Sequence, residues 1–225
     1  MTADFGAAGA AVVYTGGAVV LFGVRSWQQK RATGRTGFVA ARTRERWARL
    51  AGAGFLTAVT AGLASPALAW AHVVPLLGRG EYWTAGPWVW AGMGVALGGF
   101  GLAVAAQQTM GESWRIGVDA TERTDLVTRG IFRVVRNPIF TAMIAAQLGT
   151  TLMAPTWLSV LGLAALVAGC QVQVRLVEEP YLARVHGDRY HGYAARTGRF
   201  LPGIGRWGSQ SSEDLATSRG SAGSS

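Results

Sequence analysis

The stretch Asn137–Val174 reads NPIFTAMIAAQLGTTLMAPTWLSVLGLAALVAGCQVQV, 38 residues without Asp, Glu, Lys or Arg. One α-helix of that length would extend roughly 57 Å, nearly twice the hydrocarbon thickness of a bilayer. Pro155 lies near its middle, and proline removes a backbone donor and disfavours helix at the preceding residue. We therefore expect two short helices, over about 139–154 and 156–174, that form a hairpin.

Three further stretches carry no charged residue: Phe5–Val24, Leu50–Gly78 and Tyr82–Gly111, with 20, 29 and 30 residues. Each is long enough for one transmembrane helix, which needs about 20 apolar residues. Only 15% of the chain is charged, against roughly 25% in a soluble domain, and these stretches lack the polar face of a soluble helix. The sequence thus predicts an all-α integral membrane protein with five transmembrane helices, the last two forming the hairpin.

The basic residues are distributed unevenly over the loops of this arrangement. Of 21 Lys and Arg, eight lie in 25–49, five in 112–136, seven from 175 onward and one, Arg79, in the second loop. Short cytoplasmic loops collect Lys and Arg, so the N-terminus is expected outside and the C-terminus in the cytoplasm, in the cell inner membrane. The net charge of +9 then favours anionic lipid headgroups as partners and disfavours nucleic acid.

The chain divides into three expected regions. Residues 1–110 hold three transmembrane helices and a basic loop, 111–202 hold the polar motifs with helices four and five, and 203–225 form a tail in which 12 of 23 residues are Gly or Ser. Such a tail is expected to be flexible. One cysteine, Cys170, excludes a disulfide framework and a cysteine zinc cluster, and no metal site is expected.

Charged residues of both signs are concentrated after the expected third helix. Loop 112–136 holds four acidic and five basic residues, which favours a folded loop with internal ion pairs over a simple lipid anchor. Glu178 and Glu179 follow the expected fifth helix, and carboxylates near a helix end oppose its dipole unless they have partners. Two interpretations stay open: they pair with Arg175 or with loop arginines, or one of them binds a polar or cationic ligand.

Several short motifs occur in a fixed order. They are LVTRGIF at 126–132, RNPIF at 136–140, Glu178-Glu179, then Leu182, Gly187, Tyr190 and Tyr193, and finally RFLP at 199–202. This set, covering about residues 110–202, resembles the isoprenylcysteine carboxyl methyltransferase family, which itself resembles the membrane phospholipid N-methyltransferases. The chain departs from the family pattern at Asn137, where the family has His, and at Phe132 and Phe140, where it commonly has Tyr.

The resemblance implies an S-adenosylmethionine pocket on the cytoplasmic side. Glu178 would anchor the cofactor through polar contacts, Phe132 and Phe140 would pack against it, and Arg175 would contact substrate, so that Arg175 and Glu178 are the expected catalytic residues. The full expected cofactor set is Thr124, Leu126, Val127, Phe132, Asn137, Pro138, Ile139, Phe140 and Glu178.

The resemblance also implies a lipophilic methyl acceptor, either a carboxylate, an amine or a thiol, that enters from the bilayer. Two other functions stay open: an inactive membrane scaffold of the same fold, suggested by Asn137, and an NADPH-dependent membrane reductase. The sequence leaves the oligomeric state open.

Overall fold

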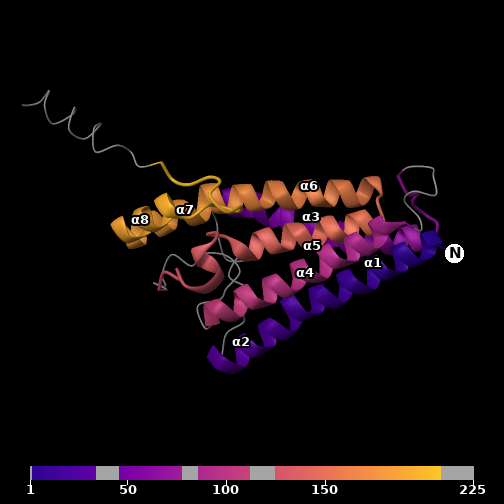
Figure 1. The fold of residues 1–225 in the computed structure, drawn as a ribbon, viewed down its shortest axis with the longest axis horizontal. Coiled ribbons are helices and arrows are strands. Elements are labelled where there is room, and N and C mark those ends of the chain that lie inside the picture. Colours follow the sequence, from indigo (N-terminus) through magenta and orange to yellow (C-terminus); the bar gives the residue numbers. More distant parts are fainter. Residues whose placement is uncertain (1, 34–45, 78–85, 112–124, 209–225) are drawn as a thin grey trace, which may run out of the picture.

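The structure, a computed structural model, describes residues 2–33, 46–77, 86–111 and 125–208 of the chain. Long helices run side by side along the molecule (Figure 1), and no β-strand occurs in the described ranges. In chain order the elements are α1 (Thr2–Ala18), η1 (Val19–Val24), α2 (Arg25–Thr33), α3 (Arg46–Trp70), α4 (Pro87–Met110), η4 (Gly130–Arg133), α5 (Pro138–Met153), α6 (Trp157–Val172), η5 (Gln173–Glu178), α7 (Glu179–His186) and α8 (Asp188–Arg196). Here η1 and η5 are π-helical turns and η4 is a 3₁₀ turn.

Four helices are long and apolar enough to cross a membrane: Phe5–Arg31, Arg46–Trp70, Pro87–Met110 and Trp157–His186. The chain is therefore a multi-pass membrane protein. The fourth expected span, over about 139–154, corresponds to α5, an apolar helix of 16 residues that is shorter than the other four. Its length is roughly 24 Å, somewhat less than the hydrocarbon thickness of a typical bilayer, so a span count of five stays a prediction.

The turn expected at Pro155 separates α5 from α6. Thr156 caps the start of α6: its Oγ1 accepts a hydrogen bond from the Ser159 amide at 3.0 Å, and Ser159 Oγ accepts one from the Thr156 amide at 2.9 Å. This reciprocal cap satisfies two amide groups that would otherwise lack partners at a helix N-terminus. Pro155 and the Thr156–Ser159 cap thus stabilise the turn at which the long apolar stretch reverses direction.

The second helix of the hairpin does not end near residue 174, as expected, but continues through η5 and α7 to His186. Pro180 does not stop it because this proline lies in the first turn of α7, directly after the π turn, where a missing amide hydrogen is tolerated. Glu178 and Glu179 consequently lie inside a continuous helical path. We expected Glu178 and Glu179 to need partners because they would lie at the C-terminal end of a helix, and this reason does not apply to residues inside a helical path.

Small residues allow the helices to approach closely. A Cβ atom built on Gly99 of α4 would lie 2.5 Å from the Ala146 amide nitrogen of α5, and one on Gly54 of α3 would lie 3.0 Å from the Ala165 carbonyl oxygen of α6. Membrane helices associate through such surfaces because small side chains let the backbones come into van der Waals contact. The pairs α4–α5 and α3–α6 are accordingly the most extensive contacts between elements.

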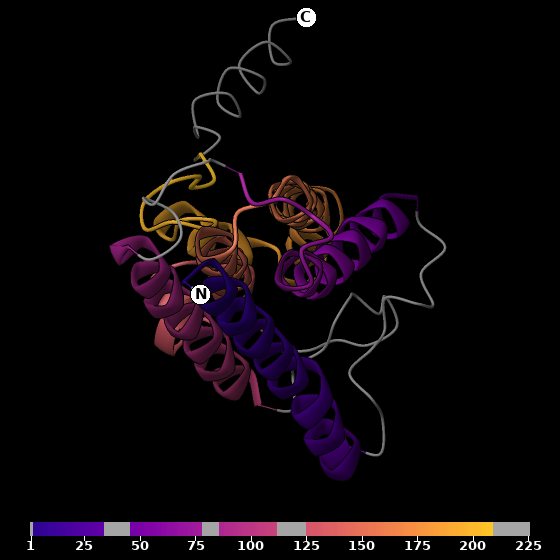
Figure 2. The same cartoon turned by 90° about the vertical axis from the view of Figure 1, so that its right-hand side faces the viewer.

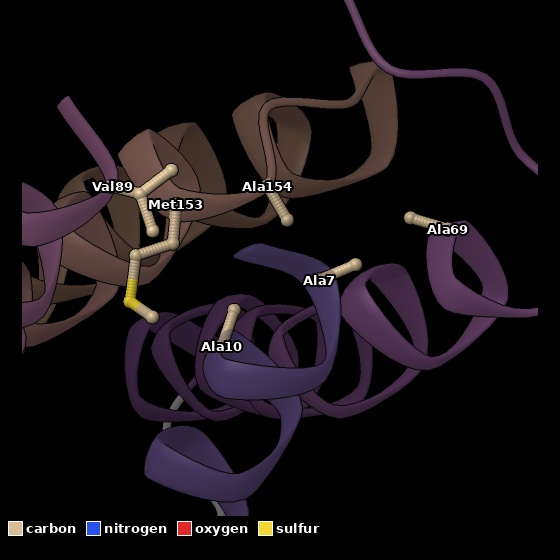
Figure 3. Close-up of a cluster of buried hydrophobic side chains, with 6 residues drawn as sticks. All are labelled: Ala7, Ala10, Ala69, Val89, Met153 and Ala154. Carbon is tan, nitrogen blue, oxygen red and sulfur yellow. The ribbon is translucent and has the colours of Figure 1, made fainter. Parts of the chain in front are cut away.

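One end of the bundle is closed by a small hydrophobic cluster, which Figure 3 shows. Met153 lies at its centre, between Val89 of α4 and Ala10 of α1. The Leu77 amide donates a hydrogen bond to the Pro155 carbonyl at 2.7 Å, which ties the segment after α3 to the hairpin turn. This end holds the start of α1 and the α5–α6 turn.

The opposite end gathers the polar segments. The C-terminal ends of α2 and α4, the η4 turn, the start of α5 and the α7–α8 segment all lie there (Figure 1). Seen along the bundle in Figure 2, α1 and α3 diverge away from the N-terminus. The candidate site is built at this end.

Candidate functional site

The N-terminus of α5 is joined to the C-terminal segment by backbone hydrogen bonds. The Arg136 amide donates to the Gly198 carbonyl at 2.8 Å, and the Asn137 amide donates to the Arg199 carbonyl at 3.1 Å. Thr141 Oγ1, one turn into α5, donates to the Phe200 carbonyl at 2.7 Å. These contacts bring together motifs that lie about sixty residues apart in the sequence.

Three charged side chains form a network beneath this junction. Arg199 binds Glu179 through two hydrogen bonds, Nε to Oε1 and Nη2 to Oε2, both at 2.8 Å. Arg136 Nη2 donates to the same Oε1 at 2.6 Å. The Glu179 hydrogen bonds raise the pKa of the Arg199 guanidinium above its ordinary value. One carboxylate therefore holds two cations.

Two members of the network are buried, since Arg136 is 6% exposed and Glu179 is 5% exposed, and Arg199 is half-buried. Arg136 Nη1 also donates to the backbone carbonyls of Ala194 and Thr197. Burying charges is costly unless they are paired and hydrogen-bonded. The ion pairs and backbone hydrogen bonds offset that cost, although Arg136 Nε has no hydrogen-bond partner among the described residues. The network joins the start of α5, the start of α7 and the segment after α8.

An aromatic cluster lies next to the network. Tyr193 Oη donates to the Phe132 carbonyl at 2.6 Å, and the Tyr190 ring packs edge-on against Trp207 with centroids 5.7 Å apart. Leu126 packs against the same cluster. Burial raises the pKa of Tyr193 to about 12 and also raises that of Tyr190. Both phenols are thus neutral at physiological pH, and Tyr193 positions η4.

Glu178, the neighbour of Glu179, has a different environment. Its Oε1 accepts a hydrogen bond from Gln173 Nε2 at 3.1 Å, within the π turn η5. The side chain is partly exposed, and in the described part of the chain no Lys, Arg or His lies within ion-pair distance of it. A carboxylate has about four lone-pair sites, so Glu178, which accepts one hydrogen bond, keeps more acceptor capacity than Glu179, which accepts three.

The expected cofactor residues have varied placements. Leu126, Val127, Asn137, Ile139 and Phe140 are partly buried, while Phe132 and Pro138 are buried. Thr124 lies outside the described residues. Leu126, Phe132 and Asn137 contact the C-terminal segment, through the Tyr190–Tyr193 cluster, the Tyr193 hydroxyl and the Arg199 carbonyl respectively.

Three of the expected residues already have protein partners. Phe140 packs against Phe55 of α3, with ring centroids 5.5 Å apart. Asn137 Nδ2 donates to the Arg199 carbonyl at 3.1 Å. Arg175 is exposed and its Nε donates to Gln171 Oε1 at 2.8 Å.

The sequence interpretation missed the roles of Arg136, Glu179 and Arg199. Pairing with a loop arginine was one of two open possibilities for the two glutamates, and it holds for Glu179 with Arg136. Arg199 was quoted only as part of a motif. No periodic signal connected it to Glu179, because the two residues are 20 positions apart and lie on different elements.

Residues 87–189 match the model of a family described as Phospholipid methyltransferase. The match begins at the first residue of α4 and ends in α8, so it includes Arg136, Asn137, Glu178 and Glu179. It confirms, at the level of this family, the expected relationship to membrane phospholipid methyltransferases. No curated protein matches the chain.

Proposed function

We propose that this chain, whose residues 87–189 match a family of membrane methyltransferases, transfers a methyl group from S-adenosylmethionine to a lipophilic acceptor at the cytoplasmic membrane face. The observation that carries the proposal is the coincidence of that match with the junction at one end of the helices. There the start of α5, the η5–α7 segment and the segment after α8 meet through hydrogen bonds and ion pairs.

The residues at this junction suit the chemical groups of the cofactor. S-adenosylmethionine carries a sulfonium and an ammonium, for which the partly exposed Glu178 carboxylate is a complementary acceptor. The partly buried Ile139 supplies apolar surface, Phe132 packs behind the site, and the side-chain oxygen Oδ1 of Asn137 supplies a further acceptor. When bound, the cofactor would supply an electrophilic methyl group on sulfur.

Asn137 stands where the resembling family has His, and its side chain supports the fold here. Its Nδ2 atom donates a hydrogen bond to the Arg199 carbonyl, and this bond joins the C-terminal segment to the start of α5. An amide can both donate and accept hydrogen bonds, so this substitution is compatible with a formed pocket. We therefore favour an active enzyme over an inactive scaffold.

The protein's contribution to methyl transfer would be orientation and exclusion of water. The network of Arg136, Glu179 and Arg199 would hold the walls of the site in place without contacting the reactants. A carboxylate acceptor would need no general base, whereas an amine acceptor would first have to lose a proton. The isoprenylcysteine carboxyl methyltransferase-like chemistry, with Arg175 as a substrate contact, is the more specific form of the proposal.

The test is transfer of a labelled methyl group from S-adenosylmethionine. The purified chain, in detergent with an extract of bacterial lipids and with a set of small hydrophobic acids, amines and thiols, is expected to produce a labelled organic-soluble product. Glu178→Ala should abolish it, whereas Asp188→Ala, an exposed carboxylate on α8, should retain it. Absence of labelled product from every acceptor, with folded protein, would contradict the proposal.

A further inference from the structure

We propose that Gln173 is a positioning residue that uses the π turn η5 to hold the Glu178 carboxylate in the orientation that binds the cofactor. This inference rests on the proposed function and adds a residue to it. It starts from one contact, the hydrogen bond of 3.1 Å from Gln173 Nε2 to Glu178 Oε1.

The two residues are five positions apart, a spacing that an α-helix does not bring together. With about 3.6 residues per turn, side chains five apart in an α-helix point about 140° away from each other. A π turn closes its backbone bonds between residues i and i+5, which places residue i+5 close above residue i. The π turn Gln173–Glu178 begins and ends at these two residues, so its geometry brings the two side chains within hydrogen-bond distance.

The buried position of Gln173 indicates that its side-chain carboxamide has a specific role. It is 7% exposed and lies between Val172 and Val174, in a turn that contacts α3. A carboxamide buried in such apolar surroundings costs free energy unless it is hydrogen-bonded. An apolar residue would suit the packing at least as well. The partner that Gln173 does satisfy is the one carboxylate of the pair that Arg136 and Arg199 leave free.

The adjacent glutamates thus have separate tasks. Glu179 is held by two arginines and fixes the junction, while Glu178 is held by one neutral donor. A neutral donor orients a carboxylate without neutralising it. In the described residues no protein cation occupies Glu178, so a cationic ligand can pair with it, whereas an arginine in the place of Gln173 would occupy that carboxylate.

The test is a double-mutant cycle on cofactor affinity with the full-length chain in detergent. Kd for S-adenosylmethionine is measured by calorimetry for the wild type, Gln173→Met, Glu178→Ala and the double variant. Gln173→Met preserves side-chain volume and should fold. It is expected to raise Kd about tenfold, a loss typical of a hydrogen bond to a charged group. In the Glu178→Ala background the same change should leave Kd unaltered, because there is no carboxylate left to position.

A matched control is Gln171→Met, two residues away on the same helix, where the carboxamide accepts from Arg175 and does not contact Glu178. Its Kd for the cofactor should equal that of the wild type.

Two results would overturn the positioning role while leaving the proposed function intact. One is a wild-type Kd in Gln173→Met. The other is an equal loss of affinity in both backgrounds, which would show a general packing role. A wild type that binds no cofactor would instead overturn the proposed function, and the inference with it.

Discussion

Arg136 connects the start of α5 to the two other segments that form the candidate site. Its guanidinium binds Glu179 and the carbonyls of Ala194, Thr197 and Gly205. The next residue, Asn137, donates a hydrogen bond to the Arg199 carbonyl. Arginine suits the task because its planar group donates several hydrogen bonds in fixed directions. The residue before the Asn-Pro motif therefore connects three separate segments.

Replacing Glu179 by Gln should destabilise the fold strongly. The change leaves the buried Arg136 cation and the half-buried Arg199 cation without a counterion, and breaking a buried pair in this way costs about 3–5 kcal/mol. Denaturant titration of the purified protein in detergent measures the free energy of unfolding. Glu178→Gln is the control and should cost far less, because Glu178 pairs with no cation in the described ranges. Equal losses for the two variants would contradict the assignment of separate tasks.

Tyr193 gives the fold a dependence on alkaline pH. Burial raises its pKa from 10.0 to about 12 in the folded state, so the unfolded chain loses this proton first as pH rises. The stabilisation is fully present below pH 10 and is lost as pH rises toward 12. Tyr193→Phe should remove the hydrogen bond to Phe132, costing about 1 kcal/mol, and should make the decline of stability between these pH values shallower. An unchanged slope in the variant would contradict this role.

At the scale of the elements, close contact of α4 with α5 depends on glycine. A Cβ at Gly99 would lie within 2.7 Å of backbone atoms of α5, whereas one at Gly98 meets no atom within 4 Å. Gly99→Ala should therefore lower the free energy of unfolding by about 1–3 kcal/mol through overpacking. Gly98→Ala, its neighbour on the same helix, should be neutral or slightly stabilising. Thermal unfolding in detergent measures both, and a neutral Gly99→Ala would show that α4 can shift at no cost.

Length and Pro155 were sufficient to predict the hairpin of α5 and α6. The π turn η5 was not predictable, because a π turn has no composition of its own and its side chains follow neither the α nor the β period. The continuation of α6 into α7 was also not predicted, because the expected helix ended where the charge-free stretch ends, at Val174, before Arg175.

The ion network was only partly predictable. The sequence showed that Glu178 and Glu179 needed partners, but five loop arginines and Arg175 were all candidates. The choice of Arg136 and Arg199 depends on the backbone bonds that join 136–137 to 198–199. Those bonds are tertiary contacts with no local signal in either segment.

At the scale of the whole molecule, the positive-inside rule predicts that the two ends of the bundle face different compartments. Pro75 lies in the exposed segment that packs on the α5–α6 turn, and Gly208 lies exposed after α8. In spheroplasts, Pro75→Cys should react with a membrane-impermeant maleimide, whereas Gly208→Cys should react only after permeabilisation. The native thiol gives little background because Cys170 is 0% exposed. The reverse pattern would invert the topology and place the candidate site outside the cytoplasm.

The central claim is that the junction around α5 and η5 binds S-adenosylmethionine. Calorimetric titration of S-adenosylmethionine and S-adenosylhomocysteine into the folded, detergent-purified chain tests it most directly, with Glu178→Ala and Asp188→Ala alongside. We expect micromolar binding of both compounds to the wild type and to Asp188→Ala, and a Kd that is about tenfold or more higher in Glu178→Ala. Absence of binding to either compound by the folded wild type would contradict it.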